Sequence, residues 1–408
     1  MNCLFIHQNF PGQYVHIARH LADAGHRIVF LTQQQCKGQI PGIRKLEYVP
    51  ASSSATHAYL GELDAGVANG LAIAGLCETL KREGFIPDLV VGHNGWGETL
   101  YLKDVWPTVP LLAYFEFFYR RSGSDVGFDP EFPPAAEEAM RLRTRNAINL
   151  LGLDAADWGQ TPTEWQRDQY PRRYWSRISV IHEGVDSDVA RPQPAARVWL
   201  KGGLCLSPDA EVITYSARDL EPYRGFHIFM RALPAILRRR ANAHVLIVGG
   251  DGVSYGRRPA GARTWREQLL DELDGQLDFS RIHFLGRLPY RQYLAILQVS
   301  TVHVYLTYPF VLSWSLLEAM SAACFVIGSR TPPVEEVIVD GENGYLVDFF
   351  DVEDVADKIA FACARRERQD PVRRAARDTV VTRYDLKTVC LPSHLALLRN
   401  LSRGRCAQ

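Results

Sequence analysis

Short apolar runs alternate with longer amphipathic stretches along the first half of the chain. Short runs of apolar residues are typical of buried strands, whereas apolar residues spaced by three and four predict helices. Residues 14–25 have the helical spacing, with Val15, Ala18, Leu21 and Ala22 on one face. The strands expected in this half are Leu4–Ile6, Arg27–Leu31, Asp88–Val91, Leu111–Phe115 and Ile178–Ile181. Strands that alternate with helices in this way predict a parallel sheet covered on both faces.

The same alternation begins again near Glu211, and its clearest helix is Phe226–Arg239. The strands expected in this second round are Val212–Ser216, His244–Val248, Ile282–Leu285, Val302–Leu306 and Phe325–Ile327. Between the two rounds, residues 186–197 contain Pro192 and Pro194 and show little periodicity, which is typical of a linker. A helical pattern returns over Thr382–Arg403.

We therefore expect an α/β protein with two doubly wound, Rossmann-like domains. The first is predicted to span residues 1–185, the linker residues 186–197, the second domain residues 198–381, and a helical tail residues 382–408. In doubly wound sheets, ligands bind at the carboxyl ends of the strands. The side chains that directly follow each strand are therefore the first candidates for function.

Composition narrows the class of protein further. The 408 residues suit two domains, and 46 basic and 46 acidic side chains cancel, which argues against nucleic acid as the main partner. The eight cysteines include no Cys-x-x-Cys pair, as expected for reduced thiols. The chain starts directly with a strand pattern instead of a signal peptide, and no run of eighteen apolar residues occurs. These features predict a cytoplasmic protein and leave peripheral contact with a membrane open. The oligomeric state cannot be read from them.

Two arginines follow the strand Val212–Ser216. If this strand ends at about Ser216, Arg218 and Arg224 lie on the next loop. Two neighbouring guanidinium groups can clamp a diphosphate and stabilise charge on a leaving group. The alternative is a pair of surface arginines bonded to Asp219 or Glu221.

A second candidate site is the start of the helix expected after Ser313. Ser313 is a good N-cap, and the backbone N–H groups of Trp314, Ser315 and Leu316 would form an anion site suited to a diphosphate. Glu318, about one turn later, can accept hydrogen bonds from vicinal hydroxyl groups such as those of a ribose. The alternative for Glu318 is an ordinary ion pair on a helix.

Glycines after other strands are weaker signals. Gly250 lies in a glycine-rich turn, and Gly286, followed by Arg287, would let the backbone approach a flat base closely. In the first half, Gly12 leaves room for a ligand between the first strand and the first helix. His93, at the end of a strand, can donate to a sugar hydroxyl. Ordinary turns and a structural histidine are the alternatives.

The triplet Asp186–Ser187–Asp188 resembles a metal-binding Asp-x-Asp motif. It follows a strand, where this composition is good turn and cap chemistry. We therefore predict no metal site there.

Taken in order, several of these segments resemble the motifs of retaining glycosyltransferases of family 4 (group 1). Arg218 and Arg224–Gly225 match the family's Gly-Arg…Lys-Gly diphosphate motif, with Arg in place of Lys. Phe284–Leu285–Gly286 resembles its base-lining segment, Glu318–Ala319–Met320 matches the Glu-Ala-Met of its signature, and Ile181–Asp186 resembles its domain crossover.

This resemblance implies a GT-B fold, in which two Rossmann-like domains face each other across a cleft and the C-terminal helix packs back on the N-terminal domain. It implies transfer of a hexose, with retention of anomeric configuration, from a nucleotide-diphosphate sugar to a hydroxyl acceptor. The acceptor would be a glycan, a lipid-linked sugar or a small molecule. No cofactor and no obligatory metal are implied. Arg218 and Arg224 would stabilise the diphosphate, Glu318 would hold the ribose, and His93 and Gly12 would lie near the transferred sugar or acceptor.

The chain departs from the family pattern at one informative position. The signature has two glutamates eight positions apart, but the first position holds Phe310, and Ser313 replaces a glycine. Because Phe310 accepts no hydrogen bond, either the donor sugar lacks the hydroxyl that the glutamate would hold, or other groups bind that hydroxyl, or the site is degenerate. A deoxy or otherwise modified hexose is one hypothesis that this suggests. The alternatives are a non-catalytic accessory subunit that binds sugar or protein, and a GT-B epimerase or sugar-phosphate synthase. Residues 120–134 form a long loop that would suit acceptor binding.

Overall fold

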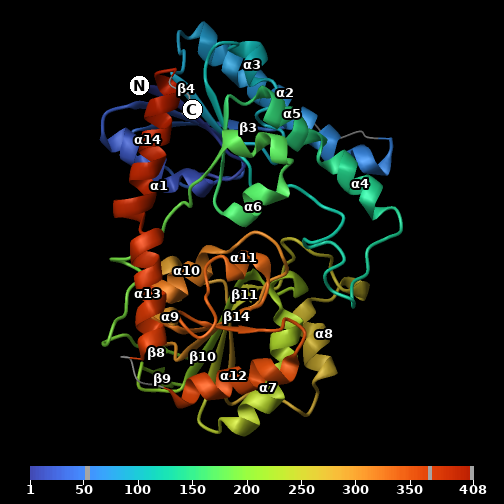
Figure 1. Cartoon of the computed structure of the whole chain (residues 1–408), viewed down its shortest axis with the longest axis vertical. Coiled ribbons are helices and arrows are strands. Elements are labelled where there is room, and N and C mark those ends of the chain that lie inside the picture. Colours follow the sequence, from blue (N-terminus) through green and yellow to red (C-terminus); the bar gives the residue numbers. More distant parts are fainter. Residues whose placement is uncertain (51–55, 366–369, 405–408) are drawn as a thin grey trace. The chain divides into compact units, whose positions relative to one another are not determined.

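The computed structural model describes residues 1–50, 56–365 and 370–404. The chain divides into two compact units, one formed by Met1–Gly184 with Lys387–Gln408 and the other by Val185–Leu386. Both units are α/β, as the alternating pattern predicts (Figure 1).

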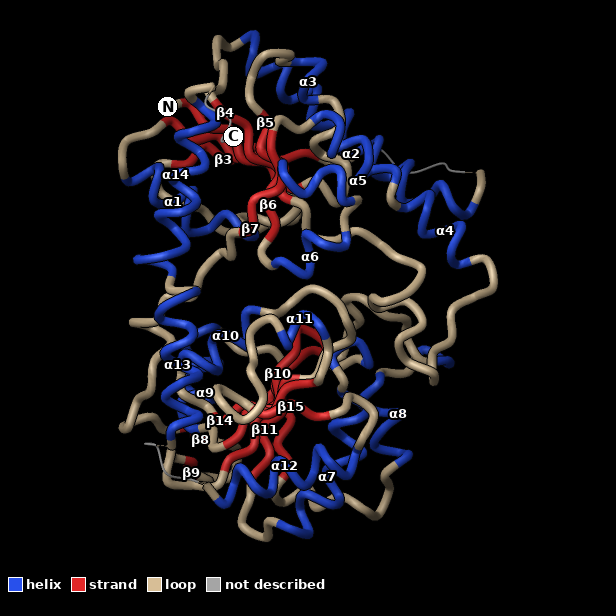
Figure 2. Tube along the Cα trace, in the orientation of Figure 1, coloured by secondary structure: helices blue, strands red, loops and turns tan. Residues whose placement is uncertain are grey.

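The first unit contains a seven-stranded sheet in the order β3-β2-β1-β4-β5-β6-β7 (Figure 2). Its strands are β1 Asn2–Ile6, β2 Arg27–Gln33, β3 Ile43–Tyr48, β4 Leu89–His93, β5 Leu111–Tyr114, β6 Trp158–Thr161 and β7 Ile178–Val180. All neighbouring pairs are parallel, so the carboxyl ends of the strands lie at one edge. The central strands are almost fully buried, which accounts for their uninterrupted apolar runs.

The helices of this unit include one from the far end of the sequence. They are α1 Val15–Asp23, α2 Gly61–Arg82, α3 Leu102–Val105, α4 Glu138–Arg145, α5 Ala147–Ala155, α6 Glu164–Gln169 and α14 Leu391–Ser402. Helix α14 lies beside α1 (Figure 1). Its Leu397, Leu398 and Leu401 share one buried cluster with Phe5 and Ile17. The expectation that the C-terminal helix packs on the N-terminal domain is therefore confirmed.

The second unit contains a six-stranded parallel sheet in the order β12-β11-β10-β13-β14-β15. Its strands are β10 Val212–Asp219, β11 His244–Gly250, β12 Ile282–Gly286, β13 Val302–Tyr305, β14 Phe325–Ser329 and β15 Tyr345–Val347. A small antiparallel pair, β8 Val198–Trp199 and β9 Cys205–Leu206, is separate from it. The helices are α7 Phe226–Arg239, α8 Trp265–Glu272, α9 Tyr290–Val299, α10 Trp314–Ser321, α11 Pro332–Glu335, α12 Val352–Ala364 and α13 Pro371–Arg383.

The helical pattern expected over Thr382–Arg403 is interrupted in the structure. Helix α13 ends at Arg383, and a π-helical turn at Leu386–Cys390 precedes α14. Between them, the Tyr384 carbonyl accepts a hydrogen bond from the Val185 amide, and the Leu386 amide donates to the Val185 carbonyl. Because these backbone groups pair with Val185, they cannot continue the helix.

Seven cysteines lie among the described residues, and none of these seven forms a disulfide; Cys406 lies outside these residues. Burial raises the pKa of the Cys3 thiol to about 11 and that of Cys77 and Cys324 to about 12. The three thiols are thus poor nucleophiles, as expected for structural cysteines.

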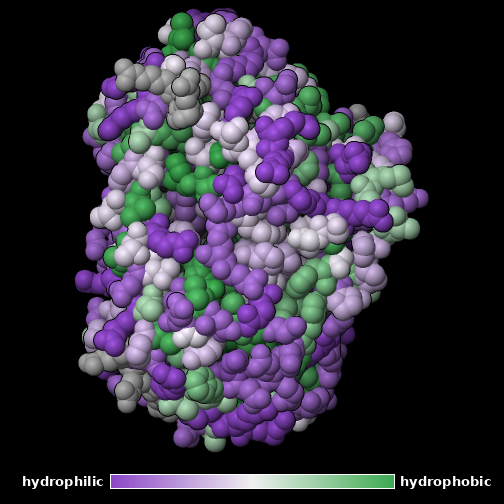
Figure 3. All heavy atoms as spheres, viewed as in Figure 1, coloured by the Kyte–Doolittle hydropathy of each residue, from purple (hydrophilic) through white to green (hydrophobic). Residues whose placement is uncertain are grey.

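None of the helices in the described part of the chain is both long and apolar enough to cross a membrane. On the face in Figure 3, hydrophilic residues predominate and hydrophobic residues gather only in limited groups.

Substitution of two helical glycines in the first unit is expected to change the stability of the protein in opposite directions. A Cβ on Gly152 in α5 would overlap the side-chain amide of Asn94, which bonds to Thr99 and Asn149 in the buried interior. We expect Gly152→Ala to lower the free energy of unfolding by about 1–3 kcal/mol. Gly75→Ala on the exposed face of α2 meets no atom within 4 Å and should add about 0.5–1 kcal/mol. Urea denaturation of both variants measures the difference, and equal effects would contradict it.

Candidate functional site

The predicted residues of the second unit gather at one edge of its sheet. Arg218 lies at the end of β10, Gly250 ends β11, Gly286 ends β12, and Ser313 precedes α10 in the connection that follows β13. Because these four strands are neighbours in the order β12-β11-β10-β13, their carboxyl ends bring the segments together.

Arg218 is not on a loop, contrary to the expectation that the strand ends at Ser216. Strand β10 continues to Asp219, and its pairing with β11 shifts register between Ser216 and Asp219. Because of this irregularity, the segment stays extended but does not pair regularly with β11. A run of apolar residues in the sequence does not indicate such an extension of the strand. Arg218 is exposed and has no hydrogen-bond or ion-pair partner among the described residues, so the alternative of an arginine paired with Asp219 or Glu221 is wrong for it.

Arg224 differs from Arg218 because it is buried. It ends a short 3-10 turn, Pro222–Arg224, and its Nη1 donates to Thr307 Oγ1 at 2.8 Å and to the Val311 carbonyl at 2.9 Å. Its Nη1 also lies 3.4 Å from the Tyr305 hydroxyl. The guanidinium therefore joins the segment after β10 to the segment after β13, a structural role that the sequence did not indicate.

Two buried carboxylates organise the glycine-rich turn after β11. Asp219 accepts from Arg287 Nη2 at 2.5 Å and from Ser254 Oγ at 2.6 Å. A Cβ on Gly250 would come within 2.6 Å of both Asp219 and Arg287, which explains the glycine there. Arg287 is thus held in place although its side chain is 66% exposed.

Glu221 is the second of these carboxylates. It accepts from the backbone amides of Ser254, Tyr255 and Gly256 at 2.8–3.3 Å. Burial raises the pKa of Glu221, and the three amides oppose that shift. Glu221 therefore serves the shape of the turn and does not pair with Arg218.

The start of α10 has the predicted N-cap, but two of the amides expected to bind an anion, those of Ser315 and Leu316, already have acceptors within the chain. Ser313 is the N-cap, and its Oγ accepts from the Ser315 amide at 3.4 Å. The Ser313 amide donates to the Tyr305 hydroxyl at 2.8 Å, and the Leu316 amide bonds to the Ser313 carbonyl at 3.2 Å. Trp314 is 37% exposed, so the first turn of the helix reaches the surface.

Glu318 lies one turn further and is only 8% exposed. The described residues include no ion-pair partner for it, so the alternative of an ordinary helix ion pair is wrong. Burial raises the pKa of Glu318, and the hydroxyls of Tyr290 and Tyr293 on α9 oppose the shift. The buried Tyr293 hydroxyl nevertheless has no partner with hydrogen-bond geometry, and neither has Ser216 Oγ. Buried hydroxyls without partners beside a carboxylate suit a ligand that carries hydroxyl groups.

Phe310 lies in an aromatic cluster that encloses Arg224. Its ring is edge-on to Tyr223 at 5.5 Å and to Tyr255 at 4.9 Å between centroids. The guanidinium carbon of Arg224 lies 5.2 Å from the Tyr255 ring and 5.9 Å from the Phe310 ring. Phe310 is 7% exposed and packs as a core residue, which the motif comparison alone could not show.

The first unit has its own polar cluster at the corresponding edge. Gly12 has a φ of +54°, and a Cβ there would meet the His7 ring at 2.6 Å. His93 ends β4, and its ring stacks on Trp96 at 4.0 Å between centroids. Its Nε2 lies 3.5 Å from Glu116, which follows β5. His7 and Glu116 were missed at the sequence level, although their positions after β1 and β5 are a signal of the same kind.

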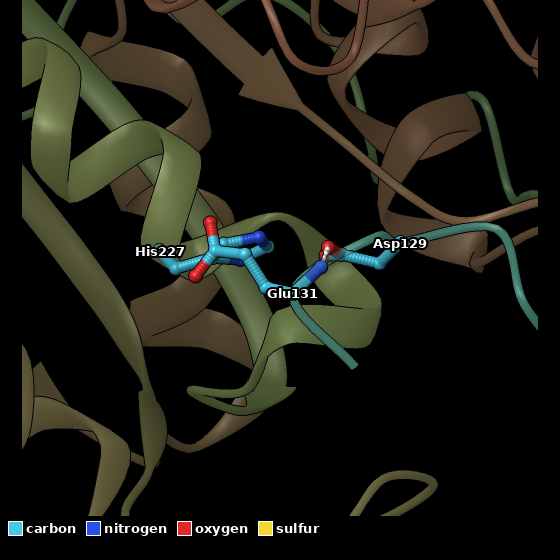
Figure 4. Close-up of side chains that lie close together, drawn as sticks. All are labelled: Asp129, Glu131 and His227. Atoms are coloured by element: carbon cyan, nitrogen blue, oxygen red, sulfur yellow. Dashed lines mark hydrogen bonds between the residues drawn. The ribbon is translucent and has the colours of Figure 1, made fainter. Parts of the chain in front are cut away.

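Hydrogen bonds hold the long loop 120–134 at two points. Arg120 Nε donates to the Gln169 carbonyl at 2.9 Å, and the Glu131 amide donates to Asp129 Oδ1 at 2.9 Å (Figure 4). Its use in acceptor binding stays a prediction.

The Asp186–Ser187–Asp188 triplet makes turn contacts, in agreement with its interpretation as turn chemistry. The Asp188 amide donates to Asp186 Oδ1 at 3.2 Å, and Ser187 Oγ donates to Asp385 at 2.5 Å.

Two family models match the chain. Residues 24–190 match the Glycosyl transferase family 4 group, and residues 206–379 match Glycosyl transferases group 1. The D-inositol 3-phosphate glycosyltransferase of Corynebacterium glutamicum is 24% identical over 359 residues, which are 84% of this chain and 80% of that protein. The GDP-mannose-dependent alpha-(1-6)-phosphatidylinositol monomannoside mannosyltransferase of Mycobacterium tuberculosis is 27% identical over 60% of this chain and 62% of its own length.

Solved structures agree on the fold. Sucrose-phosphate synthase from Thermosynechococcus elongatus superimposes with a TM-score of 0.74 at 19% identity, covering 99% of this chain and 100% of its own. Anabaena HepE in complex with UDP-glucose gives 0.68 at 15% identity, covering 98% and 99%.

These two parallel-sheet α/β units are those of the GT-B fold, which the solved structures share. The two models together cover most of the chain. Its first half is similar to the Glycosyl transferase family 4 group and its second half to Glycosyl transferases group 1, which supports a glycosyltransferase.

The buried state of Glu318 predicts a pH-dependent effect of its substitution. Because its pKa is raised in the folded chain, the folded state holds the proton more tightly than the unfolded state. The stability that this proton confers is present at low pH and is lost as the pH rises from the unfolded pKa through the raised folded pKa. Glu318→Gln avoids this loss, so we expect it to be more stable than wild type by roughly 1 kcal/mol at pH 8 and by less at pH 4.

Denaturant titrations at the two pH values measure this difference. The control is Glu342→Gln, an exposed glutamate of the same unit, which should show no such trend. A Glu318→Gln gain that is the same at both pH values would contradict the explanation by burial.

Proposed function

We propose that the chain transfers a hexosyl group from a nucleotide-diphosphate sugar to a hydroxyl acceptor, with retention of anomeric configuration. The observation that carries the proposal is the site of the second unit. An unpaired Arg218 lies at the sheet edge, and buried Glu318 lies beside the Tyr293 hydroxyl, which has no partner with hydrogen-bond geometry. A cation suits a diphosphate, and a carboxylate beside hydroxyls suits a ribose. The UDP-glucose of the HepE complex and the GDP-mannose in the name of the mannosyltransferase supply donor candidates.

In this proposal each segment contacts one part of the donor. Arg218, Arg224 and the amides of Trp314, Ser315 and Leu316 would neutralise the diphosphate, and Glu318 would hold the ribose. The base would lie against the turns that contain Gly250, Gly286 and Arg287. His93 and Gly12 of the first unit would serve the transferred sugar or the acceptor.

The proposed chemistry uses the leaving diphosphate itself as the base. The acceptor hydroxyl attacks the anomeric carbon on the face that the diphosphate leaves, and its proton passes to a departing phosphate oxygen. Charge that develops on the diphosphate is stabilised by Arg218 and Arg224. The proposed step therefore needs no cofactor, and the cationic side chains take the part that a divalent metal takes elsewhere.

Arg218 tests this assignment because it is exposed and its loss should leave the fold intact. We expect Arg218→Ala to lower kcat/KM for release of the nucleoside diphosphate by about 100-fold, because one charge-assisted clamp on the leaving group is lost. Arg238→Ala, an exposed arginine in the last turn of α7, is the matched control and should retain full activity. Turnover of UDP-glucose and GDP-mannose is measured with and without EDTA.

The alternative functions give different outcomes in the same assay. Wild-type protein that binds these nucleotides but turns neither over, with or without acceptors, would favour the accessory subunit. Transfer to a sugar phosphate, or epimerised product without sugar transfer, would favour the other GT-B enzymes. Loss of turnover only in EDTA would contradict the metal-independent step.

Phe310 extends the proposal to the donor sugar. Its ring offers an apolar, tightly packed surface where the family signature places a hydrogen-bond acceptor. We propose that the donor hexose lacks, or carries in modified form, the hydroxyl that this acceptor would hold.

A comparison of donors and variants tests this specificity. We expect wild type to prefer a deoxy-hexose nucleotide over its hydroxylated parent, and Phe310→Glu to shift the ratio of kcat/KM values toward the parent by about tenfold. Phe310→Leu, which keeps an apolar side chain, should keep the wild-type preference. Equal turnover of glucose or mannose and every deoxy sugar by wild type would overturn the hypothesis.

A further inference from the structure

Four polar side chains of the first unit meet at the carboxyl edge of its sheet. His7 follows β1, Gln13 lies in the 3-10 turn Gly12–Tyr14, His93 ends β4, and Glu116 follows β5. The three strands are neighbours in the order β1-β4-β5, so residues more than a hundred positions apart become neighbours. We call His7, Gln13, His93 and Glu116 the His–Glu cluster.

Backbone donors fix the tautomers of both histidines. The Asn9 amide donates to His7 Nδ1 at 2.8 Å, and the Gly95 amide donates to His93 Nδ1 at 3.1 Å. A ring nitrogen that accepts an N–H carries no proton, so in each neutral ring the proton is on Nε2. Burial lowers the pKa of His7 to about 3, which keeps that ring neutral.

With this assignment, the hydrogen bonds of the His–Glu cluster run in one direction and end on Glu116. His7 Nε2–H donates to Gln13 Oε1 at 2.5 Å, which turns the amide nitrogen of Gln13 toward the carboxylate. Gln13 Nε2 then donates to Glu116 Oε1 at 3.3 Å. Glu116 is thus oriented by a chain of groups whose own orientations are determined by the backbone.

The second oxygen of Glu116 faces a donor that it does not bind. His93 Nε2–H lies 3.5 Å from Glu116 Oε2, too far for a good hydrogen bond, and it has no hydrogen-bond partner although the His93 side chain is only 1% exposed. Glu116, in contrast, is 30% exposed. A buried, unpartnered donor beside an accessible carboxylate matches a hydroxyl-bearing ligand, whose hydroxyl oxygen accepts from His93 while a hydroxyl hydrogen is donated to Glu116.

We infer that Glu116 and His93 bind the hydroxyl groups of an uncharged sugar or polyol, with Gln13 and His7 as positioning residues. The inference rests on the proposed function and names a substrate class for the first unit. A phosphate in the same place would face the Glu116 carboxylate, so a phosphorylated ligand is disfavoured here. The hydroxyls belong either to the acceptor or to the transferred sugar.

Glu116→Gln tests the inference because it keeps the shape and removes the charge. We expect kcat/KM for transfer from UDP-glucose or GDP-mannose, whichever is turned over, to fall by about 10- to 100-fold, while UDP or GDP binds as in wild type. If the hydroxyls belong to the acceptor, hydrolysis of the donor without acceptor is preserved; if they belong to the transferred sugar, hydrolysis falls equally. Glu78→Gln, an exposed glutamate on α2, is the matched control.

A double variant tests whether Gln13 acts through Glu116. Gln13→Ala should lower kcat/KM by about tenfold in wild type but by much less in the Glu116→Gln background, because Gln13 acts through that carboxylate. Circular dichroism establishes that each variant is folded. Wild-type kcat/KM in Glu116→Gln, or additive losses in the double variant, would overturn the inference while leaving the proposed function intact. Failure of wild type to bind or turn over any nucleotide sugar would instead remove the proposed function.

Discussion

Parallel pairing is the constraint on which both candidate sites depend. In a parallel sheet every strand finishes at the same edge, so the residues that follow neighbouring strands meet there however far apart they are in sequence. In the first unit this rule brings His7, His93 and Glu116 together from β1, β4 and β5. In the second unit it brings Ser216 near the turns that begin at Gly250 and Gly286. Side chains beyond the last ladder bond are free to carry polar groups without disturbing the buried strands.

Burial of Arg224 sets the shape of the second unit's edge. A guanidinium out of water must be hydrogen-bonded, and here Thr307 and the Val311 carbonyl provide acceptors on the segment that leads to α10. The remaining surroundings are aromatic faces, which attract a cation through their quadrupoles. Phe310 therefore has a structural reason to be apolar: it is one wall of the enclosure around Arg224. Phe310 is thus part of a packed arrangement.

The sequence predicted the fold well because buried parallel strands are uninterrupted apolar runs, and the most regular of these, such as Leu4–Ile6 and Val302–Leu306, were located closely. Strand β3 was missed because Ile43–Tyr48 lies at the sheet edge and mixes charged with apolar residues. The placement of Ser313 as an N-cap was also predictable, since capping is a local property. The end of β10 was not, because its register shift depends on the neighbouring strand.

The hydrogen-bond partners of the site residues were harder to predict from the sequence than the places of these residues in the fold. Sequence reasoning could place Arg218, Arg224 and Glu318 near one edge, but it could not decide that Arg218 is unpaired while Arg224 is enclosed, because that depends on residues up to 87 positions away. The same limit applies to Glu116, whose orientation comes from Gln13, a residue 103 positions earlier. Spacing along the chain carries no information about such contacts.

Buried polar atoms without hydrogen-bond partners occur in both candidate sites and bear on what the sites could bind. Burying a hydroxyl or an imidazole N–H without a hydrogen bond costs folding free energy, commonly about 1–3 kcal/mol for each group. His93 Nε2, Tyr293 Oη and Ser216 Oγ are among the buried atoms without a hydrogen-bond partner in the described residues. His93 ends β4, Ser216 lies in β10 where its register begins to shift, and Tyr293 lies in the first turn of α9, which follows β12. A ligand rich in hydroxyl groups would supply hydrogen bonds to these atoms on binding. In the second unit it would do so beside buried Glu318, for which the described residues offer no cation, so the bonds gained would contribute to its affinity.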